Sequence, residues 1–434
     1  MLFTARDTTR HAALMQLVPA MHVGGVERGV LEVDAALEAS GASSFVASAG
    51  GPLASKLAGC HLCFGSLARR DPLCVLLVNP FLLALWMRRH DVRLLHARSR
   101  CLVASALLAC AITPGAQLVA TWHGLYSAGN PLRRAFNGLL LRATRLILPS
   151  AFIRTHLRRE YPRADATCWR LVHRGVAAVA GTDELPPCEA VPRRAVVLLP
   201  GRLSRSKGQA QFVTAIARLP HTLLTGDGER VLPVGRLLGA KPPSNVPRRI
   251  RSAYEQSIFE AVDSARRRGA HLTLEPHTSA MQGAYEAAAV VAMPSVRPEA
   301  FGRVLLEALA ARRLVVAFNH GAVGEIAAAV WEAGGARRVA TDRGAAGEWC
   351  DAKCGQVALV SPGVLLMGAV YLVAPGDVDG LAHAIEAALV LPVAERRWRT
   401  ECAARAACAR FGLRTFTEAT LAVYEEVHSR SATA

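Results

Sequence analysis

The sequence has few acidic and aromatic residues for its length. Its 434 residues include 34 Asp and Glu against 51 Lys and Arg, which gives a formal net charge of +17, and only 6% are aromatic. No aromatic residues are interleaved with the basic pairs, so we expect no nucleic-acid partner. Two explanations of the charge stay open: an arginine-rich solvated surface, or attraction to an anionic membrane surface or an acidic glycolipid acceptor.

A long apolar segment is also missing. The most apolar stretch, Leu73–Met87, is interrupted by Asn79 and Pro80 and is shorter than the ~20 residues of a membrane span. The first residues include Arg6 and Arg10 and contain no apolar core, which argues against a signal peptide. We therefore predict a soluble, cytoplasmic protein, with peripheral attachment at the inner face of the plasma membrane as an option.

Metal-binding and disulfide patterns are scarce. The eleven cysteines are scattered, as is typical of reduced thiols in a cytosol. Cys60 and Cys63 form a lone C-x2-C, which favours buried free thiols over a zinc site. The one D-x-D triplet, Asp377–Asp379, follows a Pro-Gly pair and is interpreted as a turn and helix cap. We expect no metal ion and no other cofactor.

The sequence instead contains alternating β-branched runs and helical patterns. Its length and its 52% of hydrophobic residues suffice for two domains, and the alternation predicts doubly wound parallel sheets of an α/β protein. We predict four parts: an N-terminal domain at 1–185, a proline-containing linker at 186–194, a C-terminal domain at 195–410 and a closing helix at 411–434. Two segments of the second domain, 231–251 and 332–368, are interpreted as insertions, the latter as an extra loop or hairpin.

The most informative stretch is 294–310. It predicts a loop after a buried strand, then a helix from about Gly302 that is apolar nearly all round and contains one acid, Glu307. Glu299 precedes that acid by eight residues, in the loop at the positive end of the helix. The amides that can hold a phosphate there belong to Ala300, Phe301 and Gly302. A nucleotide sugar would fit, with hexose hydroxyls on Glu299 and ribose on Glu307. An ordinary helix whose acids are a solvated loop residue and a core ion pair is the alternative.

Other candidate residues follow expected strands. Arg202 and Lys207 lie in a glycine-flanked loop that suits a diphosphate or is simply a solvated basic loop, and Gly226 belongs to a G-x-G turn, a common feature that says little by itself. Gly24 and Gly25 follow the first strand, where glycine lets backbone approach a ligand. Further strand-end candidates are His123, expected to face a ligand, and His96, Arg98 and Arg100, which could hold an acidic acceptor group.

Together these motifs resemble family 4 (group 1) of the retaining glycosyltransferases, which have the GT-B fold. The matching pieces, in chain order, are G-G-V-E-R-G, H-A-R-S-R, T-W-H-G-L-Y, R-G-V, G-R-x4-K-G and P-E-A-F-G-x4-E-A-x-A. They extend over about four fifths of the chain. H-A-R-S-R followed by H-G-x-Y is similar to a bacterial subgroup associated with cell-surface polysaccharide and lipopolysaccharide.

The resemblance implies two Rossmann-like domains facing across a cleft and transfer of a hexosyl-type sugar from a nucleotide-diphosphate sugar to a glycan or glycolipid hydroxyl, with retention. It implies that Glu299 binds donor-sugar hydroxyls, that Glu307 binds the ribose and that Arg202 and Lys207 neutralise the leaving diphosphate. It also makes His123 the active-site histidine near the scissile bond, while Gly24 and Gly25 line the diphosphate and acceptor side. It places the G-x-G turn of Gly226 near the nucleotide.

Some features depart from the family pattern. Glu275-Pro276-His277 replaces its usual Gly-His, and the two insertions have no counterpart. A nucleotide-sugar epimerase of the same fold, or a degenerate paralogue that binds nucleotide sugars without catalysis, are therefore the alternatives to a transferase.

Overall fold

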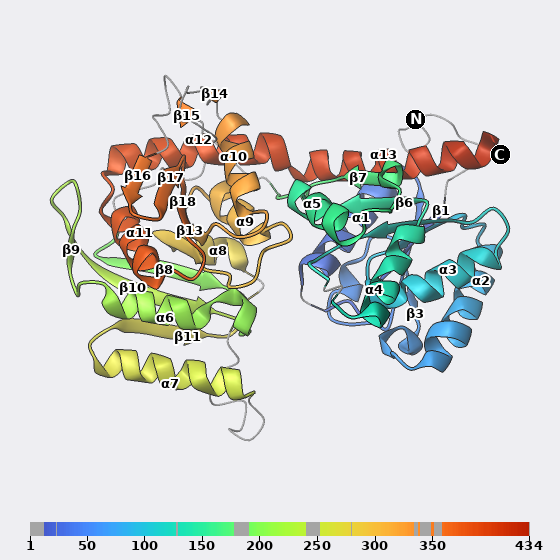
Figure 1. Ribbon diagram of the computed structural model, residues 1–434, viewed down its shortest axis with the longest axis horizontal. Coiled ribbons are helices and arrows are strands. Elements are labelled where there is room, and N and C mark those ends of the chain that lie inside the picture. The colour runs from blue at the N-terminus through green and yellow to red at the C-terminus, as the bar shows by residue number, and fades with distance from the viewer. Residues whose placement is uncertain are drawn as a thin grey trace. The chain divides into compact units, whose positions relative to one another are not determined.

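The chain forms two compact units (Figure 1). The computed structural model describes residues 13–22, 24–126, 129–177, 191–239, 252–278, 280–333, 337–338, 349–350 and 358–433. Unit 1 comprises Met1–Gly175 and Leu413–Ala434, and unit 2 comprises Val176–Gly412. The division at Gly175 precedes the expected one at 185. Of the predicted linker at 186–194, residues 186–190 lie outside the described residues, and Arg194 already begins a strand.

Unit 1 is built on a seven-stranded sheet in which all neighbouring strands are parallel. Its spatial order is β3-β2-β1-β4-β5-β6-β7. The strands are β1 (Ala13–Leu17), β2 (Ser43–Ser48), β3 (Cys60–Cys63), β4 (Leu94–Ala97), β5 (Gln117–Thr121), β6 (Arg145–Leu148) and β7 (Trp169–Leu171). The order runs outward in both directions from β1 and β4, so the carboxyl ends of these two strands flank the topological switch point where α/β proteins bind ligands.

The helices of unit 1 are α1 (Gly25–Ala39), α2 (Asn79–Arg89), α3 (Val103–Ala111), α4 (Pro131–Gly138), α5 (Ala151–Glu160) and α13 (Leu413–Thr433), with a π-helical segment η3 (Cys74–Val78) directly before α2. Ser150 caps α5 as expected, because its Oγ accepts from the Ile153 amide at 3.2 Å.

The last helix of the chain, α13, belongs to unit 1. Its apolar residues, Phe416 and Tyr424 among them, share a buried cluster with Leu14 of β1 and Val33 of α1. Its carboxylate Glu426 accepts hydrogen bonds from Arg145 of β6, at 2.6 Å, and from Nε of Arg170 of β7, at 2.8 Å.

Unit 2 contains the second doubly wound sheet, with the order β11-β10-β8-β12-β13-β18-β17-β16 and the short β9 paired to β10. The strands are β8 (Arg194–Pro200), β9 (Leu223–Leu224), β10 (Arg230–Leu238), β11 (His271–Glu275), β12 (Val290–Met293), β13 (Leu314–Phe318), β16 (Ala358–Ser361), β17 (Val364–Met367) and β18 (Val370–Val373). Every residue of β12 and β13 is buried, as expected for parallel strands covered on both faces. The switch point of this sheet lies between β8 and β12.

The helices of unit 2 are α6 (Gln209–Arg218), α7 (Ala253–Arg267), α8 (Met281–Glu286), α9 (Arg303–Ala310), α10 (Val323–Ala333), α11 (Val378–Val390) and α12 (Val393–Phe411). The start of α11 is capped by Asp377, whose Oδ1 accepts from the Gly380 amide at 2.8 Å, which agrees with the turn-and-cap interpretation of the D-x-D triplet. Among the described residues, no helix is both long and apolar enough to cross a membrane.

The expected insertion at 231–251 is wrong in its first part. Residues 230–238 form β10, an interior strand that pairs with β8 on one side and β11 on the other. The remainder, 240–251, lies outside the described residues.

Within the second expected insertion, 332–368, β16 and β17 form an antiparallel hairpin that extends the sheet beyond β18. The two-residue strands β14 (Arg337–Arg338) and β15 (Trp349–Cys350) pair with each other, and the residues between them lie outside the described part of the chain.

Candidate active site

Two loops meet at the switch point of unit 2. The loop after β8 contains Arg202 and Lys207, and the loop after β12 contains Glu299. They approach so closely that a Cβ at Gly208 would lie 1.7 Å from the carbonyl oxygen of Pro294. Gly208 also has φ +72°, so glycine is required here both by the backbone conformation and by the contact.

The carboxylate of Glu299 is held at this junction. Its Oε1 accepts from Nζ of Lys207 at 2.7 Å and from Oγ of Ser295 at 2.6 Å, and the side chain is 18% exposed. The backbone of Glu299 pairs with the loop after β13, since its carbonyl accepts from the Ala322 amide at 2.9 Å. Within the described part of the chain Oε2 of Glu299 makes no hydrogen bond, so an acceptor atom is left for a ligand hydroxyl.

The N-terminus of α9 adjoins this carboxylate. Gly302 is the N-cap residue, with φ +91°, and no side chain of the described residues caps the helix. The backbone amide dipoles at this end favour an anion. Phe301 turns its ring inward, 5% exposed, and packs edge-on against Phe411 with 6.0 Å between ring centroids, which anchors the loop that contains Ala300.

Glu307 lies one turn into α9 and already has partners. Tyr285 of α8 donates to its Oε2 at 2.9 Å, and Nε of Arg303 lies 3.5 Å from its Oε1. The carboxylate therefore makes the ion pair that was the alternative interpretation, and its contact with a ribose stays a prediction.

In unit 1 the predicted residues lie at the carboxyl ends of β1, β4 and β5. Gly24 is the N-cap residue of α1 and Gly25 is its first residue, so both lie at the positive end of that helix. His123 follows β5, and its Nδ1 lies 2.5 Å from Nη2 of Arg174. Because an arginine can only donate, Nδ1 is the acceptor and the ring proton resides on Nε2. Nε2 is buried and makes no hydrogen bond within the described residues.

The imidazole of His123 is neutral at physiological pH. Burial, and after it the positive charges of Arg174 and Arg98, hold the pKa of His123 well below its ordinary value of 6.5. A neutral ring with its proton on Nε2 can donate one hydrogen bond, and it cannot act as a strong acid.

Comparison with protein families gives two matches in tandem. Residues 23–178 match the model of Glycosyltransferase Family 4, and residues 186–330 match the model of Glycosyl transferases group 1. The chain belongs to the family 4 and group 1 glycosyltransferases. Together the two matches take in most of the chain, the first lying almost wholly in unit 1 and the second in unit 2.

Solved structures agree on the fold of this glycosyltransferase. A glycosyltransferase from Rickettsia africae superposes with a TM-score of 0.71 at 22% identity, covering 96% of this chain and 99% of that one. Anabaena HepE in complex with UDP and glucose gives 0.70 at 18% identity, covering 96% and 100%. WaaG, a glycosyltransferase involved in lipopolysaccharide biosynthesis, gives 0.62 at 14%, covering 94% and 98%. The predicted GT-B fold is confirmed. No significant match exists among curated proteins.

Two of the predicted acceptor residues of the glycosyltransferase are part of the core. His96 is fully buried, and its two ring nitrogens lie 2.6 Å from the Tyr424 hydroxyl and 2.8 Å from Oγ1 of Thr121. Arg98 is 2% exposed and donates twice to Oε1 of Gln16, at 3.0 and 2.6 Å. Both side chains are committed to internal partners, so the prediction that they hold an acceptor is wrong.

The third, Arg100, is half-buried. It donates to Oδ1 of Asn137 at 3.0 Å and lies 4.4 Å from the ring centroid of Tyr126. Its contact with an acceptor stays a prediction.

The structure does not bring Gly226 to the donor residues. Its amide donates to the Val390 carbonyl at the end of α11, beside the amino end of β10, whereas Glu299 and Lys207 lie at the carboxyl ends of the strands. Gly226 thus lies away from Glu299 and Lys207, and its contact with a nucleotide stays a prediction. The glycine at the carboxyl end of β10 is Gly239, where φ is +113° and a Cβ would lie 2.6 Å from the Gly201 carbonyl.

Arg174 is a partner of His123 that sequence reasoning missed. It is 6% exposed, and a Cβ at Gly29 would lie 2.4 Å from its Nη1, so the glycine makes room for the guanidinium. The R-G-V motif marked the position, but nothing local in the sequence indicated that Arg174 meets His123.

Two other features of the chain are not the donor site. Cys60 and Cys63 are exposed free thiols on β3, so their predicted burial is wrong, and no group of metal-ligating side chains that could hold an ion occurs in the described residues.

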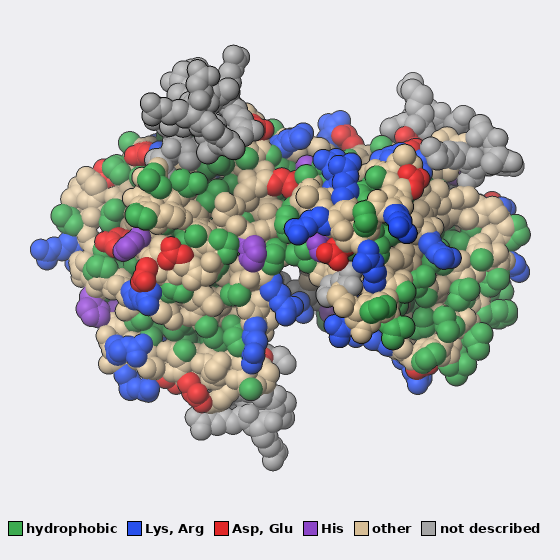
Figure 2. Space-filling view, in the orientation of Figure 1, with side chains coloured by type: hydrophobic (Ala, Val, Ile, Leu, Met, Phe, Trp, Pro, Cys, Tyr) green, Lys and Arg blue, Asp and Glu red, His purple; other side chains and the backbone are tan. Residues whose placement is uncertain are grey.

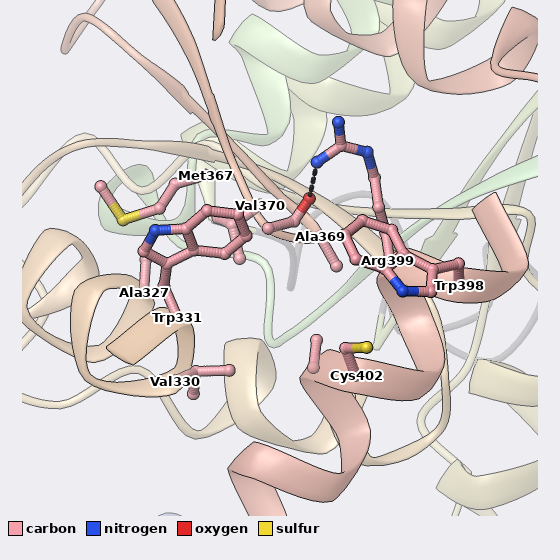
Figure 3. Close-up of a pocket in the computed structure, with 11 residues that line it drawn as sticks. Ala327, Val330, Trp331, Met367, Ala369, Val370, Trp398, Arg399 and Cys402 are labelled. Atoms are coloured by element: carbon pink, nitrogen blue, oxygen red, sulfur yellow. Dashed lines mark hydrogen bonds between the residues drawn. The ribbon is translucent and has the colours of Figure 1, made fainter. Parts of the chain in front are cut away.

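A cavity of about 20 Å³ in unit 2 lies between α10, β17–β18 and α12 (Figure 3). Nη1 of Arg399 donates to the Gly368 carbonyl beside it, at 3.0 Å. None of the predicted site residues lines this cavity, which has room for about one water molecule.

Proposed function

We propose that this glycosyltransferase moves a sugar from a nucleotide-diphosphate sugar to a hydroxyl of a glycan or glycolipid, with retention of anomeric configuration. The observation that carries the proposal is the Lys207–Glu299 pair, at 2.7 Å, beside the N-terminus of α9 at the switch point of unit 2. A cation, a helix end and a carboxylate with one unused oxygen match the diphosphate and the hydroxyls of such a donor.

The leaving group would be neutralised mainly by the loop after β8. Lys207 has three protons, so it can bind a phosphate oxygen and keep its bond to Glu299. Arg202 is exposed in the same loop and can join it. These charges, with the helix end at Ala300–Gly302, would stabilise the negative charge that develops on the diphosphate. The proposed reaction uses no metal ion.

In the bond-changing step the bond from the anomeric carbon to the phosphate oxygen breaks while the acceptor oxygen attacks the same face of the sugar. The acceptor proton passes to the departing phosphate oxygen. Oε2 of Glu299 would hold sugar hydroxyls, Glu307 the ribose, and Nε2 of His123 would donate to the donor sugar near the scissile bond. Gly24 and Gly25 would let the backbone of unit 1 approach the diphosphate and acceptor side.

A UDP-sugar is the first donor to test, because HepE is described in complex with UDP and glucose. A role in cell-surface glycan or lipopolysaccharide synthesis is proposed on the motif resemblance and on the similarity to WaaG, which is involved in lipopolysaccharide biosynthesis.

The test is a thermal-shift screen with UDP, GDP, ADP and their sugars, followed by isothermal calorimetry with the best ligand. One nucleotide should raise the midpoint, and Glu299→Ala should abolish sugar transfer while leaving the fold intact. Glu286→Ala is the matched control, because Glu286 is an exposed acid of unit 2 on α8 and should leave activity unchanged. Transfer activity in Glu299→Ala, or no shift with any nucleotide, would contradict the proposal. Release of an epimerised donor would indicate the epimerase instead.

A further inference from the structure

The helical segment η3–α2 of unit 1 exposes an unusual amount of apolar surface. Between residues 73 and 85 six large apolar side chains point to solvent. Leu108 of the adjacent α3 and Ile112, the residue that caps its C-terminus, add two more. The six are Leu73 (61% exposed), Leu76 (50%), Leu77 (63%), Val78 (36%), Phe81 (66%) and Leu85 (54%). Figure 2 shows hydrophobic side chains gathered over this end of unit 1. We call these eight residues the apolar face. Scattered apolar side chains are normal on a surface, but a contiguous group indicates a binding surface.

Six of the eight residues of the apolar face lie on the outer side of the continuous helical segment η3–α2. Leu83, Ala84 and Met87 on the opposite side are buried in unit 1, so α2 is anchored by one side and free on the other. Oγ of Ser105 in α3 donates to the Val75 carbonyl in η3 at 2.7 Å, which fixes the two segments to each other. The exposed side chains are therefore presented on a rigid support.

Arginines lie at both ends of the apolar face. Arg69 and Arg70 precede the helix, and Arg88 and Arg89 end it, all four exposed. Arg69 is 3.2 Å from Asp71 and Arg88 donates to the Ile112 carbonyl. Arg70 and Arg89 make no ion pair or hydrogen bond within the described residues. A helix with an apolar side and cationic ends has the features of a segment that lies in the plane of a membrane interface.

We propose that the apolar face and its flanking arginines dock this protein on an anionic lipid bilayer, with α2 parallel to the surface. Leucine and phenylalanine side chains enter the boundary between headgroups and acyl chains, and the long arginine side chains reach lipid phosphates at both ends of the helix. A protein partner would need acids opposite both arginine pairs and an apolar strip between them; a bilayer supplies both everywhere, and the chain's net charge of +17 adds a long-range attraction to it. The proposal does not depend on which sugar is transferred.

The test is co-sedimentation of the full-length protein with two kinds of vesicle, at low and high salt. One kind is phosphatidylcholine alone, and the other contains about 30% phosphatidylglycerol, which gives its surface a negative potential. Leu77→Ser/Phe81→Ser removes two of the most exposed apolar side chains of the apolar face. Arg70→Gln/Arg89→Gln removes two cations that pair with no side chain in the described part of the protein. Leu224→Ser/Leu359→Ser is the matched control, since these leucines of unit 2 are 62% and 70% exposed.

The wild type should bind the anionic vesicles at least tenfold more strongly than the neutral ones, and high salt should weaken that binding. The serine pair should lose tenfold or more. The glutamine pair should lose about fivefold for each arginine removed, on anionic vesicles only. The control pair should match the wild type.

Equal binding to neutral and anionic vesicles, or unchanged binding of both variants, would overturn the proposal. So would dimerisation in light scattering that the serine pair abolishes without lipid present, because the apolar face would then serve a second copy of the chain. All substitutions are at exposed positions, and circular dichroism should confirm that each variant folds.

Discussion

Replacing Glu426 with Gln should destabilise unit 1, and the loss should depend on pH. Glu426 of α13 accepts from Arg145, whose side chain is only 4% exposed, and from Arg170. These two arginines lower the pKa of the Glu426 carboxyl from 4.5 to about 2. The substitution keeps the size of the side chain but removes the negative charge to which Arg145 and Arg170 donate.

The magnitude follows from the pKa shift. A shift of this size corresponds to at most about 3 kcal/mol of folding free energy. Because the side chain of Glu426 is 30% exposed, solvent screening reduces this, and we expect a loss of about 1.5 kcal/mol at pH 7. A depressed carboxyl pKa stabilises the fold above pH 4.5 and ceases to do so as the pH falls through the folded value of about 2. At pH 3 the difference between wild type and variant should therefore be less than half of that at pH 7.

The assay is urea-induced unfolding followed by circular dichroism at both pH values. Glu418→Gln is the matched control, because Glu418 lies on the same helix and pairs with Arg414, but their side chains are 59% and 90% exposed. That variant should change stability by less than about 0.5 kcal/mol. A loss in Glu426→Gln that is the same at pH 7 and pH 3 would refute the electrostatic account, and no loss at pH 7 would show that the contact does not stabilise α13.

Three further substitutions test the site and its support. Arg174→Met removes the donor that fixes the proton of His123 on Nε2, so we expect kcat to fall about 10²-fold or more. The acid limb of the pH–rate profile should move to higher pH, because the positive charge that adds to burial in lowering the pKa of His123 is gone. An unchanged profile would show that Arg174 only fills space. His96→Asn should reduce the loss of stability below pH 6.5. Burial lowers the pKa of His96 well below 6.5, so the unfolded chain gains a proton that the buried ring does not, which costs up to about 1.4 kcal/mol of folding free energy per pH unit. Parallel pH–stability curves of wild type and variant would contradict this. Gly208→Ala places a Cβ against the neighbouring loop and should weaken donor binding at least tenfold in calorimetry. Gly228→Ala controls for backbone strain alone, because Gly228 has φ +85° and open space around it. Equal donor affinities in the two variants would refute the argument from close approach.

That the loops after β8 and β12 lie together could be predicted from the sequence, because the pattern behind it is local. A strand, a turn and a helix can be recognised within twenty residues, and the carboxyl ends of neighbouring parallel strands must lie together. Lys207 and Glu299 could therefore be expected to meet although they are far apart in the chain. The structure shows that they do, at 2.7 Å.

β10 escaped prediction because its composition conflicts with its position. It contains Pro233 and Gly235, which are unusual in an interior strand. A Cβ at Gly235 would lie 2.6 Å from Leu272 of β11 and 3.0 Å from Ile216 of α6. Because glycine has no Cβ, these two elements can pack closely against β10. Only the tertiary neighbours explain this choice.

His96 and Arg98 escaped for a different reason. Their position at a strand end favoured a ligand, but the Tyr424 hydroxyl that binds His96 is supplied by a helix 328 residues later in the chain. A partner at that distance leaves no trace in the local pattern.

The membership of α13 in unit 1 also affects the order in which this protein can be completed on the ribosome. Unit 1 begins with the first strand but receives its last helix, and with it Tyr424 and Glu426, only after all of unit 2 has been made. At about 5–20 residues per second, translation of the intervening unit takes roughly 10–50 s. During that interval the nascent first half lacks the partners that α13 supplies to His96 and Arg145 and the cover it gives to the apolar core of unit 1. A fragment that ends at Gly175 would lack these partners and this cover permanently.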